Sequence, residues 1–236
     1  MPEQARPEPS QPYSVGVDLM AMVLATGWAS GVNAYAAVAL LGVLGRFAGV
    51  DDVPESLQGG DVIALSGGMY AVEFVTDKIP YVDSLWDTVS TIIRPTLGAM
   101  LGYLIAGQAE STQQALYAAV GGGSALASHV VKAAIRLGVN GSPEPFTNVT
   151  VSLGEDVAVA GVVLLAVVNP WLALAVAAVL FLVGVSLLVV LWKLVRRGWR
   201  RWQARRDTRA GRDPADVSRR TDEHGPSPGP DAGPRP

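Results

Sequence analysis

Six long apolar stretches dominate the sequence, and each is close to the length of a helix that crosses a bilayer. A bilayer core of about 30 Å needs about 20 mainly apolar helical residues. The last stretch, "WLALAVAAVLFLVGVSLLVVLW", carries no charge, whereas the second and fifth contain acidic residues. The pattern predicts an all-α, polytopic membrane helix bundle with about six transmembrane helices, at residues 17–47, 61–78, 88–107, 113–137, 149–168 and 170–192. A four- or five-span chain with re-entrant hairpins is the alternative.

Polar, proline-rich sequence flanks this apolar region at both ends. Residues 1–16 and 203–236 have the composition of disordered tails, because they hold few apolar side chains that a fold could bury. Between the tails we expect a transmembrane helical domain at 17–192 and a basic juxtamembrane helix at 193–202. The first residues lack the basic stretch and short apolar core of a cleavable signal peptide.

Lys and Arg are concentrated at one end of the chain, and this bias predicts its orientation. Of the 18 Lys and Arg residues, 12 lie at or beyond Lys193. Cytoplasmic segments beside membrane spans carry an excess of these residues, so we expect the C-terminus in the cytoplasm. With six spans, the N-terminus is cytoplasmic as well. Scarce lysine beside abundant Ala, Arg and Pro is typical of a GC-rich bacterial genome, and the predicted location is the bacterial cytoplasmic (inner) membrane.

The basic segment after the last span, "KLVRRGWRRWQARR", interleaves Arg with Trp199 and Trp202. Such a segment is expected to lie on anionic lipids, where each basic residue near the surface contributes about 1 kcal/mol. We therefore expect the lipid bilayer and its anionic lipids as partners, with a homo-oligomer as a further option. Nucleic acid is not an expected partner, because the segment directly follows a membrane span.

Ionisable residues interrupt the apolar sequence, and the predicted topology gathers them in the cytoplasmic third of the bundle. A charge at the centre of a membrane helix costs about 2.5–3.5 kcal/mol, so such residues normally face water or one another. Two pairs share a helix face because their members are four residues apart, Glu73 with Asp77 and Lys132 with Arg136. The candidates for binding an ion or a proton are Glu73, Asp77, Glu155 and Asp156, and those for binding an anion or head group are Arg94, Lys132 and Arg136.

These charges predict a hydrated vestibule open to the cytoplasm, in which two acids on one helix pair with two bases on another. Arg94 is expected to pair with Glu155 or Asp156 in the same way. Pro95 follows it directly, and proline removes a backbone donor and kinks a helix, so the kink is expected beside a buried cation. The alternative is that the charges only orient the chain and hold helices together, since long side chains near the interface can reach water.

Small and polar residues break the regular apolar pattern in the first and fourth stretches. The first reads "GWASGVNAY" and the fourth "GGGSALAS", both near the expected mid-depth of the membrane. The first contains a Gly-x-x-x-Gly pair, which lets helices approach closely. The similar spacing suggests two inverted three-helix halves with interrupted helices, an arrangement typical of transporters. The small or polar midplane candidates are Gly27, Ser30, Gly31, Asn33 and Ser124.

Catalytic motifs are missing from the sequence. It has no cysteine, which excludes disulfides, thiolate catalysis and cysteine-based metal sites. It also has no P-loop, His-Glu-x-x-His or Gly-x-Ser-x-Gly motif. Asp83 and Asp87, placed in the inner loop before the third span, are spaced like a Mg²⁺-binding pair but lack the Asp-rich motif of lipid-phosphate enzymes. We therefore predict no catalytic residues, no metal site, no cofactor and no enzymatic activity.

Three stretches together resemble the bacterial membrane family called domain of unknown function 4126: "LATGWASGVNAYAAVALLGVLGRF", "YAVEFVTDKIPYVDSLWDTVSTIIRP" and "NGSPEPFTNVTVSLGEDV". The resemblance covers roughly residues 19–190 and leaves out both ends of the chain. It implies a multi-span inner-membrane protein, and it transfers no activity and no catalytic residues.

The expected function is that of a small transporter, channel or lipid translocator. Its charge-lined vestibule would bind an ion, a proton or an anionic head group. One alternative is a non-transporting membrane scaffold or accessory subunit, whose charges only pair helices. A more distant alternative is an intramembrane enzyme that modifies lipids.

Overall fold

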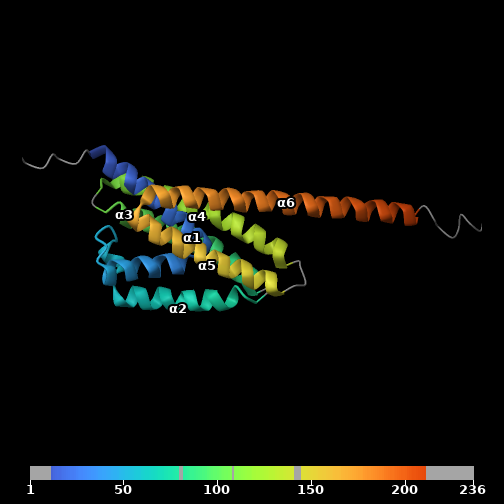
Figure 1. Cartoon of the computed structure of the whole chain (residues 1–236), viewed down its shortest axis with the longest axis horizontal. Coiled ribbons are helices and arrows are strands. Elements are labelled where there is room, and N and C mark those ends of the chain that lie inside the picture. The colour runs from blue at the N-terminus through green and yellow to red at the C-terminus, as the bar shows by residue number, and fades with distance from the viewer. Residues whose placement is uncertain (1–11, 80–81, 108, 141–144, 211–236) are drawn as a thin grey trace, which may run out of the picture. The chain divides into compact units, whose positions relative to one another are not determined.

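The computed structural model describes residues 12–79, 82–107, 109–140 and 145–210. Within these ranges the chain is helical, with one short 3-10 turn, η1 (Glu55–Leu57), and no strand, which confirms the all-α prediction. The chain divides into two compact units, Met1–Val189 and Val190–Pro236, and the bundle described below belongs to the first. The helices are α1 (Pro12–Ala48), α2 (Gly60–Thr76), α3 (Val82–Ile105), α4 (Ser111–Asn140), α5 (Pro145–Val168) and α6 (Pro170–Ala210) (Figure 1).

Five helical segments are long and apolar enough to cross a membrane, which supports a helical membrane bundle. They are Val17–Ala48, Val82–Ile105, Ser111–Gly138, Val149–Val168 and Pro170–Arg200. The remaining predicted span corresponds to α2, which has only 17 residues and carries Asp61 and Glu73. Large apolar side chains on the outside of the bundle are exposed, as expected of side chains that face lipid; they include Leu65, Ile92, Val157 and Val168.

Helix α1 is interrupted at Asn33, inside the first of the two stretches where an interruption was predicted, whereas α4, which contains the second, is helical throughout. Asn33 has φ −149° and ψ 98°, which lie outside the helical region. Its side-chain Oδ1 accepts a hydrogen bond from the Ala36 amide at 3.0 Å, the geometry of an N-cap for a new helix. In an unbroken helix that amide would bond to the Val32 carbonyl, so the break frees the Val32 oxygen for another partner.

The two halves of α1 run in opposite directions and form a hairpin with its tip at Asn33 (Figure 1). The first half runs parallel to α4. Side chains of α4 spaced by four residues donate to carbonyl oxygens of α1 with the same spacing: Ser124 to Leu24 (2.9 Å), Ser128 to Trp28 (2.8 Å) and Lys132 to Val32 (2.9 Å). The second half returns, and Arg46 near its end donates to the carbonyl of Gln58, just before α2 begins.

Small residues allow α1 to pack closely against α4 at the centre of the bundle. The ideal Cβ position of Gly27 lies 2.6 Å from the carbonyl oxygen of Gly121, and that of Gly31 meets the Ala125 carbonyl and the Ser128 hydroxyl. The two small-residue segments therefore pack against each other side by side and in the same direction. Inverted halves would make corresponding helices antiparallel, so this similarity reflects close packing of two neighbours.

The start of α1 lies beside the start of α6. The indole N–H of Trp171 donates to the carboxylate of Asp18 at 2.8 Å. From there α6 runs towards the end of α4, where Gly184 lies against Val131 and Ile135. The start of α1 and the start of α6 therefore lie at the same end of the bundle.

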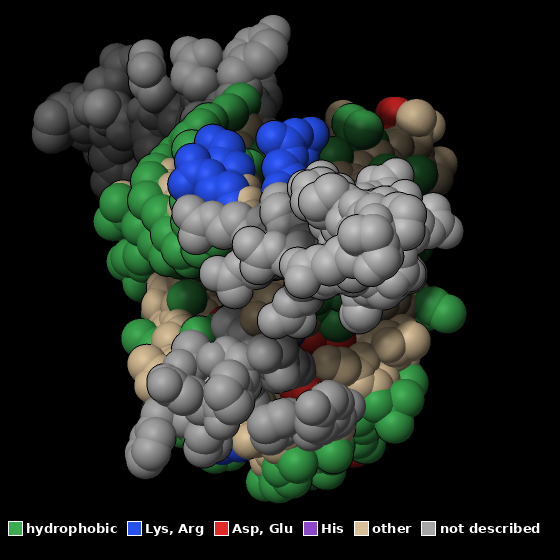
Figure 2. All heavy atoms as spheres, turned by 90° about the vertical axis from the view of Figure 1, so that its right-hand side faces the viewer, with side chains coloured by type: hydrophobic (Ala, Val, Ile, Leu, Met, Phe, Trp, Pro, Cys, Tyr) green, Lys and Arg blue, Asp and Glu red, His purple; other side chains and the backbone are tan. Residues whose placement is uncertain are grey.

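The second unit contains the end of α6, which carries the basic segment. Residues 193–202 are helical as expected, and the rings of Trp199 and Trp202 lie 5.7 Å apart between centroids. In the end-on view of Figure 2, Lys and Arg side chains gather together with hydrophobic side chains beside them. Of the predicted tails, residues 12–16 and 203–210 are helical in α1 and α6, and residues 1–11 and 211–236 lie outside the described residues.

Replacing Gly31 should show whether the close contact of α1 with α4 holds the bundle together. Gly31→Ala is expected to lower the free energy of unfolding by about 1–3 kcal/mol, because the added methyl group meets a backbone carbonyl that cannot move aside. Unfolding by SDS titration of the detergent-solubilised protein, followed by circular dichroism, measures this loss. Gly123→Ala on α4, where no atom lies within 4 Å, is the matched control and should change stability by less than about 1 kcal/mol. Equal losses would contradict the packing argument.

Candidate functional site

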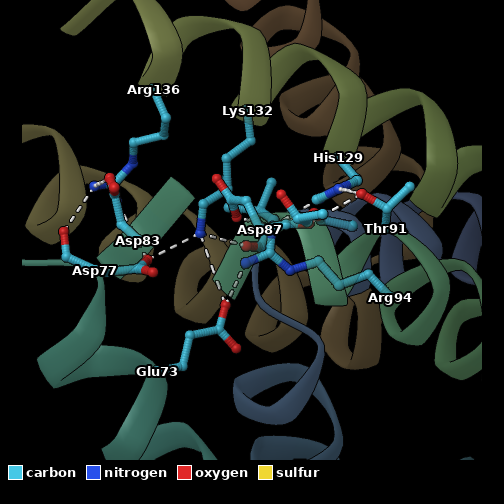
Figure 3. A network of polar contacts seen from close by, with 12 residues as sticks. Glu73, Asp77, Asp83, Asp87, Thr91, Arg94, His129, Lys132 and Arg136 are labelled. Carbon is cyan, nitrogen blue, oxygen red and sulfur yellow. Dashed lines mark hydrogen bonds and ion pairs between the residues drawn. The ribbon is translucent and has the colours of Figure 1, made fainter. Parts of the chain in front are cut away.

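Nine ionisable side chains from α2, α3, α4, α5 and the residue that ends α2 meet around the tip of the α1 hairpin (Figure 3). In this view Lys132 and Arg136 reach down from α4, and Glu73 points up towards them from α2. All but one are buried, and the side chain of the exception, Glu155, is 17% exposed. We call this set the ion-pair network: Glu73, Asp77, Asp83, Asp87, Arg94, His129, Lys132, Arg136 and Glu155.

Arg94 joins α3 to α2 from a fully buried position. Its Nη2 lies 2.6 Å from Glu73 Oε1, and its Nη1 lies 3.0 Å from Asp87 Oδ1. The prediction that Arg94 pairs with Glu155 or Asp156 is therefore wrong, because its helix face points to α2 and α1. Pro95 lies inside α3, and the helix continues beyond it to Ile105. The Ser30 hydroxyl of α1 donates to the Arg94 carbonyl at 3.1 Å, which ties the hairpin to this point of α3.

Lys132 occupies a cage of oxygen atoms at the hairpin tip. Its ammonium donates to the Val32 carbonyl, which the break at Asn33 has freed, at 2.9 Å. Three carboxylates complete the cage, at 3.0 Å for Asp77, 3.3 Å for Glu155 and 3.7 Å for Glu73. The predicted pairing of the acids of α2 with the bases of α4 is thus present, and Asn33 is part of the reason for it.

Arg136 binds acids from three separate segments. Its Nη2 lies 2.6 Å from Glu155 Oε2, and its Nε donates to the other oxygen of the same carboxylate at 3.3 Å. This two-pronged contact is the strong geometry for a guanidinium and a carboxylate. Asp77 lies at 3.2 Å and Asp83 at 3.4 Å, so Arg136 connects α4 to α5, to the end of α2 and to the start of α3.

His129 is neutral in this network, and its hydrogen bonds identify the tautomer. A guanidinium can only donate, so His129 Nδ1 accepts from Arg94 at 2.8 Å. Its Nε2 then carries the proton and donates to the Thr91 hydroxyl at 3.0 Å, which itself donates to the Asp87 carbonyl at 3.0 Å. The imidazole therefore extends the network from Arg94 back to α3 without adding a charge.

The network holds more negative than positive charge. Its five carboxylates face three cationic side chains, which leaves two surplus negative charges if all are ionised. The neighbouring Asp156 and Lys78 add one charge of each sign and leave this difference unchanged. Among the described residues, Glu73 Oε2 and Arg94 Nε have no hydrogen-bond partner although both residues are buried. The surplus carboxylates and these buried polar atoms therefore allow the site to accept an additional proton or ligand.

Sequence reasoning placed Asp83 and Asp87 in a loop, but both are buried network members. The prediction started the third span at residue 88, whereas α3 starts at Val82. The added turns place Asp83, Asp87 and Arg94 on the buried face of one helix. Their spacing of four and seven residues was the signal that could have identified them. Asp156, by contrast, is only half buried, and no ion pair joins it to the network among the described residues.

The midplane candidates take part in helix packing. Gly27 and Gly31 lie at the contact with α4, Ser30 binds the Arg94 carbonyl, and Asn33 caps the second half of α1. Ser124 binds the Leu24 carbonyl and also lines a small cavity. These residues therefore shape the hairpin that delivers the Val32 carbonyl to the network.

Three cavities adjoin these residues. An apolar groove of about 380 Å³ lies between α1, α4, α5 and α6 and is bordered by Lys132 and Glu155. A second cavity, of about 150 Å³, shares Trp28 and Phe181 with the groove. A third, of about 100 Å³, is lined by Asp87 and Thr91 on the other side of the network. Within the described residues, no group of three His, Asp or Glu side chains is arranged to hold a metal ion.

Removing Arg94 should expose the cost of burying its acidic partners alone. Arg94→Met is expected to lower the free energy of unfolding by about 3–5 kcal/mol, because Glu73 and Asp87 lose their nearest cation in a buried site. Arg46→Met is the matched control, since the exposed Arg46 donates to a loop carbonyl and lies 5.7 Å from the centroid of the Phe47 ring; it should cost less than about 1 kcal/mol. SDS titration measures both. Adding Glu73→Gln to Arg94→Met should recover part of the loss, and failure to do so would argue against a coupled pair.

Comparison with known proteins gives a family and no activity. No curated protein and no solved structure matches this sequence. A family model described as a domain of unknown function, DUF4126, matches residues 20–190. The matched region contains every residue of the ion-pair network and confirms the resemblance found from the sequence. Because the match covers most of the chain, the protein belongs to the DUF4126 family.

Proposed function

We propose that this protein is a transport protein of the bacterial cytoplasmic membrane, and that its ion-pair network binds a proton or a monovalent cation. The observation that carries the proposal is the two surplus carboxylates of the network inside a membrane bundle. An uncompensated charge at the centre of a membrane helix costs about 2.5–3.5 kcal/mol. Binding of a proton or a cation removes this energetic cost, and release restores it. A site that couples ion binding to transport needs this property.

Glu73 is the residue we assign to this uptake. It is completely buried, its Oε1 binds Arg94, and its Oε2 has no hydrogen-bond partner among the described residues. A protonated Oε2 would donate a hydrogen bond and carry no charge, so uptake changes both the charge and the bonding of the site. The Lys132 ammonium lies 3.7 Å from Glu73 Oε1, so a change in the charge of Glu73 would alter the ion pairs that Lys132 makes with Asp77 and Glu155.

A cation fits the network better than an anionic head group. Arg94, Lys132 and Arg136 would have to bind the anion, and each already contacts at least two carboxylates. An added anion would also meet the surplus negative charge of the network. Electrostatic repulsion in a medium of low dielectric constant disfavours this strongly.

Two cavities offer routes to the network from different sides. The groove reaches Lys132 and Glu155, and the third cavity reaches Asp87 and Thr91. We propose that the basic segment after Val189 lies on the anionic cytoplasmic surface.

A membrane scaffold is the second candidate, and one observation favours it. The three cationic side chains of the network bind carboxylates from α2, α3 and α5, as a purely structural lock between helices would. In a scaffold the two surplus carboxylates would stay protonated permanently, and replacing one acid by its amide would leave the function intact. The two candidates therefore differ in what they predict for Glu73.

Glu73→Gln should abolish transport by a coupled protein and leave a scaffold unaffected. Proteoliposomes with a pH-sensitive dye inside are energised with a potassium gradient and valinomycin, and proton entry is followed with time. The wild-type protein should admit protons faster than protein-free liposomes, and Glu73→Gln should return the rate to that background. Glu110→Gln, the same substitution at an exposed position before α4, should keep the wild-type rate.

Sodium and potassium entry is measured in separate vesicles without valinomycin, because valinomycin itself carries potassium and a monovalent cation is the other ligand in the proposal. If none of the three ions crosses faster than in protein-free liposomes, transport of these ions is refuted and the scaffold is favoured. If the ions cross at equal rates with Glu73 and with Gln at that position, the assignment of the coupling residue is refuted.

A further inference from the structure

The apolar groove beside the network is open to the outer surface of the bundle. Two of its wall residues on α6, Val183 and Leu187, are each 51% exposed. Its other walls include Val131 and Ile135 of α4 and Ala158 of α5. The adjoining cavity lengthens the available space along α1, since Trp28 and Phe181 border both. A molecule dissolved in the lipid could therefore enter the groove from the side.

Two charged side chains, one from α4 and one from α5, border this groove. Among the described residues that line it, only Lys132 and Glu155 are charged. The Lys132 side chain is 3% exposed and Glu155 is 17% exposed, so a ligand in the groove meets the carboxylate first. Behind Glu155 lies the rest of the network with its surplus negative charge. The groove thus combines apolar walls with an accessible negative end.

We propose that the groove binds a lipophilic cation, with its apolar body between α4, α5 and α6 and its positive end against the Glu155 carboxylate. This inference rests on the proposed function, because it names the substrate class of the same site. A positive end placed here would offset part of the surplus charge in a medium where charge pairs attract strongly. An anionic amphiphile would be repelled, and a neutral lipid chain would leave the surplus uncompensated.

The network can release Glu155 to such a ligand without leaving Lys132 alone. Lys132 shares Glu155 Oε2 at 3.3 Å, and it keeps the Val32 carbonyl at 2.9 Å and Asp77 at 3.0 Å. Arg136 likewise keeps Asp77 and Asp83. Arg136 holds both oxygens of Glu155 and Lys132 shares Oε2, so a ligand cation competes with these two bases for the carboxylate. Because both bases keep other acids, this exchange does not dismantle the hairpin tip.

Tetraphenylphosphonium and tetraphenylborate provide a probe and its control, because they have nearly the same shape and opposite charge. Each is equilibrated with the full-length protein in nanodiscs of zwitterionic lipid, and bound ligand is measured by equilibrium dialysis against protein-free nanodiscs. We expect saturable binding of the phosphonium and no binding of the borate above background. Glu155→Gln should weaken phosphonium binding about tenfold, which corresponds to about 1.4 kcal/mol.

A glycine pair on α5 tests the groove itself. Gly154 lines the groove and has no atom beyond its chain neighbours within 4 Å of its Cβ position, so Gly154→Leu adds a side chain at the groove wall without a clash at its Cβ. This variant should weaken phosphonium binding at least about tenfold. Gly161→Leu is the matched control on the same helix; Gly161 has equally open surroundings and does not line the groove, so the wild-type affinity is expected.

Several outcomes would overturn the inference. Equal binding of the phosphonium and the borate, or unchanged binding in Gly154→Leu, would show that the groove is not the site of a cation. Loss of binding in Gly154→Leu with full binding in Glu155→Gln would show a groove for apolar chains without charge recognition. These results are independent of the ion-flux test: Glu73-dependent flux without phosphonium binding refutes only this inference, and phosphonium binding without any flux refutes only ion transport.

Discussion

The contact between the Lys132 ammonium and the Val32 carbonyl joins the two features on which the structure depends, the broken α1 helix and the ion-pair network. The Asn33 side chain takes over the Ala36 amide, and this frees the Val32 oxygen. A buried carbonyl without a partner costs about 1–3 kcal/mol, and a buried ammonium without one costs more. Each group therefore satisfies the other, so the hairpin of α1 and the position of α4 stabilise each other.

The same constraint explains why the network has members on four helices. A buried cation needs several acceptors, and one helix face can offer two or three at most. Arg136 accordingly takes its acids from the end of α2, from α3 and from α5. The bundle is locked by these contacts, yet the acids outnumber the bases. This surplus is the feature on which the proposed uptake of a proton or a cation rests.

The groove and the network meet at Glu155, and this position gives that residue two environments. Its carboxylate pairs with Arg136 on the inner side and borders apolar walls on the other. The ammonium of Lys132 lies between a deep carboxylate, Glu73, and a more accessible one, Glu155. Such a site can couple the charge state of Glu73 to the occupancy of the groove at Glu155. This arrangement unites the proposed ion site and the proposed ligand groove in one mechanism.

Local properties of the sequence determined the helices, their apolar character and the identity of most charged residues in the site. Hydropathy and the four-residue spacing of Glu73 with Asp77 act within one helix, so they can be read without knowing any neighbour. Only the tertiary structure decided that α1 reverses at Asn33, that α3 begins early enough to bury Asp87, and that Arg94 pairs with Glu73. The physical reason is that one non-helical residue changes the direction of everything after it without changing the average hydropathy of the segment. The partner of a buried charge depends on which helix faces meet, and the directions of the helices determine which faces meet.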